Sequence, residues 1–153
     1  MIRRSQARCL TLLFLVLATA GIASLQTNSY TQTSLSSDTA GTAAFTSPDL
    51  SNPWGIAFIP GNPFWIADNN SGKATLYDKT GNLLGSFTNP PPHGSSNPAT
   101  PTGIVANTQG GFNVAGISSQ FIFDTEDGTI SGWYPTIPTA ILAIDNSTKG
   151  GPQ

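Results

Sequence analysis

The chain has 153 residues, the size of one domain, and 38% of them are hydrophobic, which is enough for a packed core. Sixteen glycines, twelve prolines and only 9% charged residues disfavour long helices and favour short strands separated by turns, so we expect an all-β fold. The formal net charge of −2 and the lack of a basic patch exclude the nucleic-acid-binding classes.

The first 23 residues have the three-part pattern of a secretory signal. Three arginines precede an apolar run from Leu10 to Ala20, and small residues offer cleavage after Ala20 or Ala23. We expect a signal-peptide helix, removal of residues 1–23, and a secreted or cell-surface protein. The alternative is an uncleaved anchor, which would be the protein's sole attachment to a membrane, although the run is short for a span.

Residues 24–51 form the mature N-terminal segment, which is rich in serine and threonine. Polar and apolar residues alternate from Tyr30 to Leu35, a pattern that predicts a lone strand, while a disordered terminus is an equal alternative. Beyond residue 23 the chain keeps three lysines, eight acidic residues and no cysteine, so its formal net charge is −5 and core packing alone must hold it.

Residues 52–88 contain four apolar runs separated by three turns rich in glycine and asparagine. The spacing predicts a four-stranded antiparallel sheet with strands at residues 55–59, 64–68, 74–78 and 83–87. Apolar residues occupy both faces of the second strand, which indicates a sheet packed between two neighbours.

Residues 89–100 form a proline-rich connection outside the sheet, because proline cannot donate to a strand ladder. His93, the single histidine, lies in it without a second histidine or a cysteine, so we interpret it as a solvated loop residue.

Residues 101–146 predict a second sheet that begins with a strand at residues 103–107, but two strand registers are possible after it. The first takes residues 112–116, 120–124 and 129–134 as strands. The second treats residues 112–116 as an insertion and uses residues 121–125, 129–133 and 140–145. We favour the second because it explains the last apolar run, and we expect residues 147–153 to begin a further unit.

Two stretches of the chain repeat each other. Two of the echoes have an offset of 48 residues: Asn52-Pro53-Trp54-Gly55-Ile56-Ala57 with Thr100-Pro101-Thr102-Gly103-Ile104-Val105, and Phe64–Asp68 with Phe112–Gly116. A third echo joins Leu76–Asp78 to Ile122–Asp124 at an offset of 46. A period near 50 built from short strands is typical of β-propeller blades. Two blades cannot close a ring, so we expect an incomplete propeller, with residues 24–51 placed to supply a ring-closing strand.

The strings Asn52–Phe58, Phe64–Asn69, Thr75–Tyr77 and Phe121–Trp133 together resemble a family of exported bacterial proteins of unknown function with an NHL-like β-propeller. The resemblance covers residues 30–149. It implies an N-terminal fragment of a protein about twice as long, and it implies no catalytic residues, since none are known for that family.

Asp68, Asn70 and Gly72 imitate the opening of a calcium loop, but the distal glutamate of such a loop is missing. An ordinary hairpin turn is the better interpretation, and Gly116 replaces Asp68 in the echoed stretch. Calcium held by Asp68 and Asn70 is therefore the alternative interpretation of this turn, and no other cofactor is expected.

Trp54 and Asn52 are the weak candidates for ligand binding, because Trp54 precedes the first strand and an exposed indole can stack on a sugar or another flat ligand. Asp124, Glu126 and Asp127 could do acid–base work or hold a cation, but a charged turn that keeps a sheet edge soluble is the better interpretation.

Three functions are compatible with these patterns. The first is a scaffold that binds a protein or small-molecule partner, without catalysis. The second is a fragment of a propeller hydrolase or lyase with a cation in its channel, which would need inward-pointing acidic residues that the inner strands barely offer. The third is a truncated product with no function of its own.

Overall fold

The computed structural model describes residues 29–149, and the expected signal helix and both cleavage positions lie outside that range. The chain divides into two units, residues 1–32 and residues 33–153, and every strand of the described range belongs to the second unit. Residues 29–149 contain strands and turns with no helix, as the composition predicted, so this part holds no helix able to cross a membrane.

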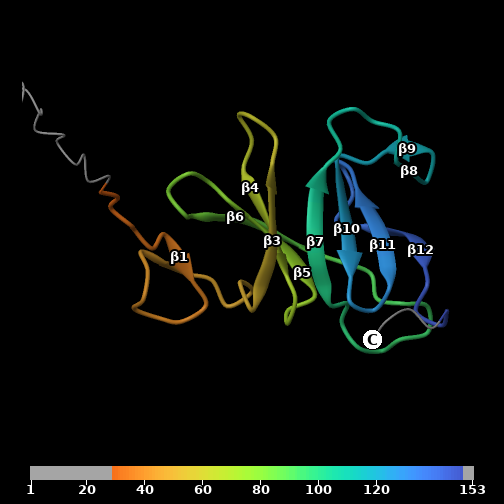
Figure 1. Cartoon of the computed structure of the whole chain (residues 1–153), viewed down its shortest axis with the longest axis horizontal. Coiled ribbons are helices and arrows are strands. Elements are labelled where there is room, and N and C mark those ends of the chain that lie inside the picture. The colour runs from red at the N-terminus through yellow and green to blue at the C-terminus, as the bar shows by residue number, and fades with distance from the viewer. Residues whose placement is uncertain (1–28, 150–153) are drawn as a thin grey trace, which may run out of the picture. The chain divides into compact units, whose positions relative to one another are not determined.

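The first sheet has four antiparallel strands in chain order (Figure 1). They are β3 (Pro53–Phe58), β4 (Phe64–Asp68), β5 (Lys73–Tyr77) and β6 (Leu83–Thr88). The predicted four-stranded sheet is confirmed. Gly61, Gly72 and Gly81 take positive φ in its three turns, a backbone conformation that glycine adopts without strain.

The second sheet follows the favoured register. Its strands are β7 (Pro101–Ala106), β10 (Phe121–Thr125), β11 (Thr129–Trp133) and β12 (Ile141–Asp145), and β7 pairs directly with β10. Strands β8 (Asn113–Val114) and β9 (Ile117–Ser118) form a separate hairpin in the connection between β7 and β10.

The hairpin corrects part of the predicted repeat. Phe64 pairs with Phe58 in the first sheet, and Phe121 pairs with Ala106 in the second, so β4 corresponds to β10. The echoes at Phe112–Gly116 and Ile122–Asp124 therefore do not join equivalent strands. The offset of 48 holds for β3 and β7, and the inserted hairpin lengthens it for the strands that come after it.

The predicted strand at residues 30–35 is absent. Instead, β1 (Ser36–Ser37) and β2 (Phe45–Thr46) form a two-residue parallel pair. We call residues 33–51 the strap, because this segment lies over one face of the first sheet. Polar side chains of the strap bond to the first sheet and to the backbone of one of its turns. These contacts with distant residues place the segment, and the local alternation of polar and apolar residues does not record them.

The hydrophobic core lies between the two four-stranded sheets. Trp65 of β4 stacks on Phe121 of β10 with ring centroids 4.5 Å apart, and it also contacts Trp133 at 4.6 Å and Phe87 at 5.2 Å. Contacts of this kind bury large apolar areas and add favourable ring geometry. The face of the first sheet that carries Trp65 is called its B face, and the opposite face is its A face. The equivalent faces of the second sheet take the same names. The B face of the first sheet thus packs on the A face of the second.

Strands β3 and β7 lie side by side where the sheets meet (Figure 1). A Cβ atom on Gly55 would lie 2.7 Å from the Thr102 carbonyl oxygen, so only glycine permits this approach. Each strand also begins with an irregularity in its ladder, between Pro53 and Gly55 in β3 and opposite Phe123–Thr125 in β7. The echoed Pro-x-Gly sequences therefore encode the same bulge twice.

Candidate functional site

Polar side chains from both sheets gather at the end where β3 and β7 begin. Asn69 Nδ2 donates to Glu126 Oε2 at 2.9 Å, which joins the turn after β4 to the turn after β10. Asn52 Nδ2 donates to Asn69 Oδ1 at 3.3 Å and to Asn70 Oδ1 at 3.4 Å. This strand-start cluster thus combines three amides and one carboxylate.

The backbone places equivalent residues of the two sheets in this cluster. Asn69 N–H donates to the Asn52 carbonyl at 3.1 Å, and Glu126 N–H donates to the Thr100 carbonyl at 3.0 Å. Asn52 has a φ of 53°, a left-handed conformation that asparagine tolerates better than most residues. Thr100, which takes its place in the second sheet, is held instead by Asp127, whose Oδ2 accepts from the Thr100 N–H at 2.8 Å.

Trp54 lies two residues from Asn52, at the bulge of β3, and 57% of its surface is exposed. Trp65 and Trp133 are buried in the core. Of the three tryptophans, Trp54 is therefore the one available to a ligand, and Asn52 lies in the polar cluster beside it.

Asp68 and Asn70 are not brought together around a cation site. Asp68 is fully buried, and its Oδ2 accepts from the Thr75 hydroxyl at 2.6 Å, whereas Asn70 Oδ1 accepts from Asn52. Burial raises the pKa of Asp68 to about 7, and Asp68 Oδ1 has no hydrogen-bond partner in the described residues. Residues 29–149 contain no group of three or more metal-ligating side chains of the His, Cys, Asp and Glu types.

Asp49 ties the strap to the first sheet above Asp68. Its carboxylate bonds to Lys73 Nζ at 2.7 Å and to the Ser86 hydroxyl at 2.9 Å, and its carbonyl accepts from the Ser71 hydroxyl at 2.8 Å. The Lys73 bond is the main reason that the pKa of Asp49 lies below its usual value. Sequence reasoning missed this contact because the partners are far apart in the chain.

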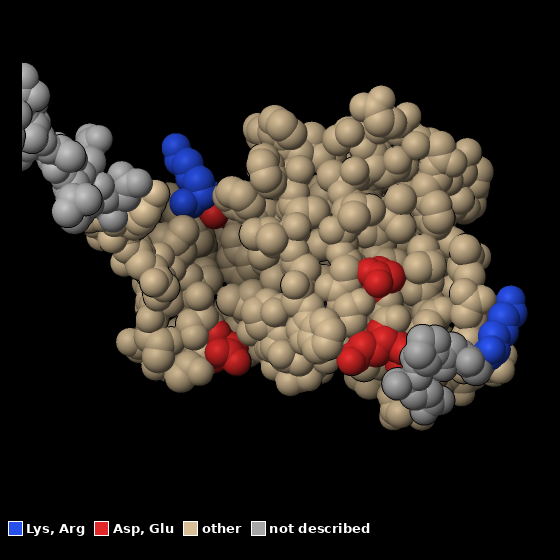
Figure 2. Space-filling model, viewed as in Figure 1, with Lys and Arg blue, Asp and Glu red and all other residues tan. Residues whose placement is uncertain are grey.

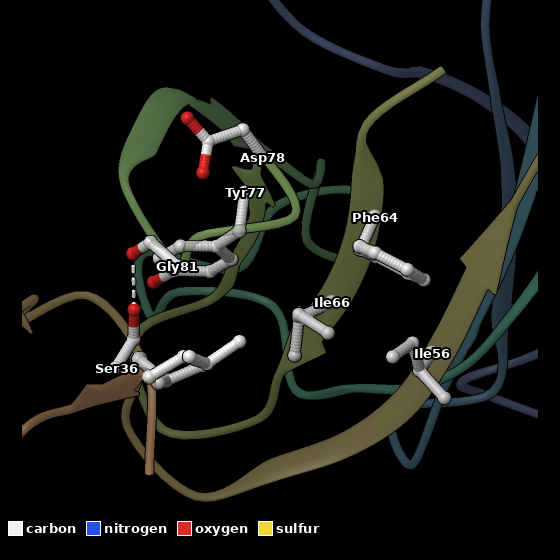
Figure 3. Close-up of a pocket in the computed structure, with 9 residues that line it drawn as sticks. Ser36, Ile56, Phe64, Ile66, Tyr77, Asp78 and Gly81 are labelled. Carbon is white, nitrogen blue, oxygen red and sulfur yellow. Dashed lines mark hydrogen bonds between the residues drawn. The ribbon is translucent and has the colours of Figure 1, made fainter. Parts of the chain in front are cut away.

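A recess lies between the strap and the A face of the first sheet (Figure 3). It encloses about 290 Å³, and its walls are mainly apolar side chains: Leu35, Leu50, Ile56, Phe64, Ile66 and Tyr77. The polar groups at its rim are bonded within the protein. The Ser36 hydroxyl donates to the Gly81 carbonyl, and the Tyr77 hydroxyl donates to Ser47 Oγ at 2.7 Å.

The remaining sequence candidates lie apart from this recess. His93 is exposed, and its backbone N–H donates to Asp145. Asp124 is exposed beside Gly103, Glu126 joins the strand-start cluster, and Asp127 holds Thr100. Charged side chains are few on the face that Figure 2 shows, and most of the acidic ones gather at the lower right of that view, which makes that part of the face unfavourable for an anionic ligand.

Two uncharacterised proteins of Acanthamoeba polyphaga mimivirus are similar to this chain. One is 40% identical over 115 residues, which cover 71% of the chain and 28% of the relative. The other is 46% identical over 74 residues, which cover 48% of the chain and 19% of the relative. No protein-family model and no solved structure matches.

These comparisons correct the resemblance inferred from the motif strings. The relatives are viral rather than bacterial, and no NHL family model matches, so assignment to an exported bacterial NHL-like family is wrong. The strings reflect strand and turn chemistry that recurs in sheets of this kind, which is why they misled. The chain spans only a minor part of either relative's length.

Proposed function

We propose that residues 33–149 form two consecutive blades of a β-propeller that acts as a binding scaffold. Three features support this proposal: both sheets run in chain order from the strand at the junction outward, both open with the same bulge, and β3 packs on β7 through Gly55. Blades of a propeller are four-stranded sheets arranged in this way around a channel.

The observation that carries the binding role is the exposed Trp54, two residues after Asn52 of the strand-start cluster. An indole face stacks on the apolar face of a sugar ring, while amide and carboxylate groups bond to its hydroxyls. Asn52, Asn69 and Glu126 supply such groups from two sheets at once. We therefore propose a neutral, polyhydroxylated ligand, since the charged group of the cluster, Glu126, is a carboxylate that accepts hydrogen bonds from hydroxyls and disfavours an anion.

A glycan microarray probed with the full chain tests this ligand class, and calorimetry then measures the affinity for the best glycan. Trp54→Ala should weaken binding by at least about tenfold, because loss of one stacked aromatic typically removes a kilocalorie or more. Phe58→Ala is the matched control, since Phe58 is an exposed aromatic on the A face. The proposal would be refuted if both variants lost the same glycan affinity, or if the wild-type chain bound no glycan on the array.

We also propose that the protein is exported, and this part of the proposal rests only on the signal-peptide pattern of residues 1–23. Expression with a C-terminal tag, followed by mass measurement of the product, should give a chain that begins at Gly21 or Ser24. A full-length product found only in the cytosol would remove this element and leave the binding role to be judged separately.

A further inference from the structure

Residues that are buried where the two sheets pack together have equivalents in the other sheet that are exposed, because those equivalents lie on the outer faces of the pair of sheets. Ile104 on the A face of the second sheet is 7% exposed, whereas its equivalent in the first sheet, Ile56, is 64% exposed. On the B faces, Ala57 of the first sheet packs against the core, whereas its equivalent Val105 is 56% exposed. Each end of the stack thus presents one half of an interface that the chain has already built.

We infer that a second copy of this chain covers these faces. The B face of the second sheet in one copy packs on the A face of the first sheet in the next copy. The inference rests on the proposed blade arrangement and not on the ligand at Trp54. It continues the observed interface, in which a B face packs on an A face in the same order. Apolar residues left in water at both ends supply the driving force.

The polar end of the interface is complementary as well. Within one copy the amide of Asn69 donates to the carboxylate of Glu126. Between copies, the equivalence of these positions places Glu126 of one copy beside Asn69 of the next. Asn69 has a second N–H and Glu126 a second oxygen, and neither makes a hydrogen bond within the described residues, so the same pair can form again.

The fold also confines the contact to the strands nearest the junction. The strap covers the first sheet over β5 and β6, where it bonds to Tyr77 and Lys73 of β5 and to Ser86 of β6. The β8–β9 hairpin covers the second sheet over β11, since a Cβ on Gly132 would lie 2.9 Å from Val114. The exposed areas that remain are those around Ile56 on β3, which also lines the recess beside the strap, and Val105 on β7.

One residue opposes the contact. Asp124 occupies the position of Ala67, which is fully buried between the sheets, and a Cβ on Gly103 would collide with the Asp124 carboxylate. A charge placed in a sheet interface without a partner weakens it. Association should therefore be reversible and dependent on concentration.

An interface between unlike faces builds either a closed ring or an open filament. Propellers usually have four to eight blades, so a ring of two-sheet chains would contain two to four copies. The inference is thus a discrete oligomer of two to four chains.

Sedimentation velocity with the full chain at about 1 to 200 µM tests the inference. The wild type should shift from one chain to a discrete oligomer. Ile56→Asp blocks one face and Val105→Asp the other, so each variant alone should remain monomeric. An equimolar mixture of the two should form a dimer and nothing larger, because each keeps one working face. Leu84→Asp, at an exposed position on β6, the strand of the first sheet farthest from β3, should behave as wild type.

Asp124→Ala provides a gain-of-association test that does not depend on a disruptive variant. Introducing the residue found at the buried equivalent position should lower the dissociation constant about tenfold or more. Several results would overturn the inference. The first is that both the wild type and Asp124→Ala are monomeric. The second is that Val105→Asp forms dimers by itself, which indicates a contact between two A faces. The third is that the mixture of Ile56→Asp and Val105→Asp stays monomeric. Loss of glycan binding in Trp54→Ala with assembly retained would count only against the ligand proposal.

Discussion

Asn69 and Glu126 occupy the same position in consecutive sheets and are joined by a 2.9 Å hydrogen bond from the Asn69 amide to the Glu126 carboxylate. Each residue follows the second strand of its sheet, and each backbone N–H bonds to the residue that precedes its sheet's Pro-x-Gly bulge. The link therefore couples two turns that are distant in sequence and fixes how the sheets meet.

Removal of this link should destabilise the stack. Glu126→Ala leaves the mostly buried Asn69 amide without its acceptor, at a cost of about 1–3 kcal/mol in the free energy of unfolding. Glu126→Gln keeps an acceptor oxygen and should cost clearly less. Urea unfolding measures both. Equal midpoints for Glu126→Ala and wild type would show that the two turns are not coupled.

The close approach of β3 and β7 gives a prediction with a matched control in the chain. Gly55→Ala places a Cβ 2.7 Å from a backbone oxygen, so the strands must separate, at a cost of about 1–3 kcal/mol. Gly103→Ala, at the equivalent position, meets the end of the Asp124 side chain, which can rotate away. Thermal unfolding should therefore show a large loss for Gly55→Ala and a small one for Gly103→Ala.

Two tryptophans separate core packing from surface exposure. Trp65→Ala should cost about 3–5 kcal/mol, because Trp65 contacts Phe87, Phe121 and Trp133 in the core. Trp54→Ala should change stability by less than about 1 kcal/mol because that side chain is largely exposed. Chemical denaturation of both variants checks the ranking, and a larger loss for Trp54→Ala would contradict the assignment of the core.

The sequence was sufficient for the local elements and insufficient for their partners. Alternation and turn glycines predicted β3 to β6, and the unexplained apolar run at Ile141–Asp145 selected the correct register for the second sheet. That register treated residues 112–116 as an insertion, but the β8–β9 hairpin itself was not predicted, because the same residues imitate a strand of the repeat. Pairing in a sheet depends on contacts between distant residues, which a repeat offset does not record.

The candidate site shows the same division. Trp54 and Asn52 could be named from their place before the first strand, but Asn69 and Glu126 could not, because a hydrogen bond between residues 57 apart in sequence leaves no local pattern. Asp68 was noted for its spacing to Asn70, whereas its notable property is complete burial. Burial of a residue at the end of a strand depends on contacts distant in sequence, and these leave no local pattern.

Asp68 gives the last prediction, on pH. Its pKa is about 7 in the folded protein against an ordinary value of 3.8, mainly because burial disfavours the charged form. A group whose folded pKa is raised contributes its full stability below the unfolded pKa and loses it as the pH rises to the folded pKa. The free energy of unfolding should therefore fall as the pH rises from about 4 to about 7, and this contribution should level off above pH 7.

Asp68→Asn keeps the acceptor for Thr75 and removes the titration, so it should flatten this decline. His93→Gln, at an exposed residue of the proline-rich connection, is the control and should keep the wild-type slope. Urea unfolding at half-unit steps from pH 4 to pH 8 measures all three proteins. If Asp68→Asn retained the wild-type slope, burial of Asp68 would not be the source of the pH dependence.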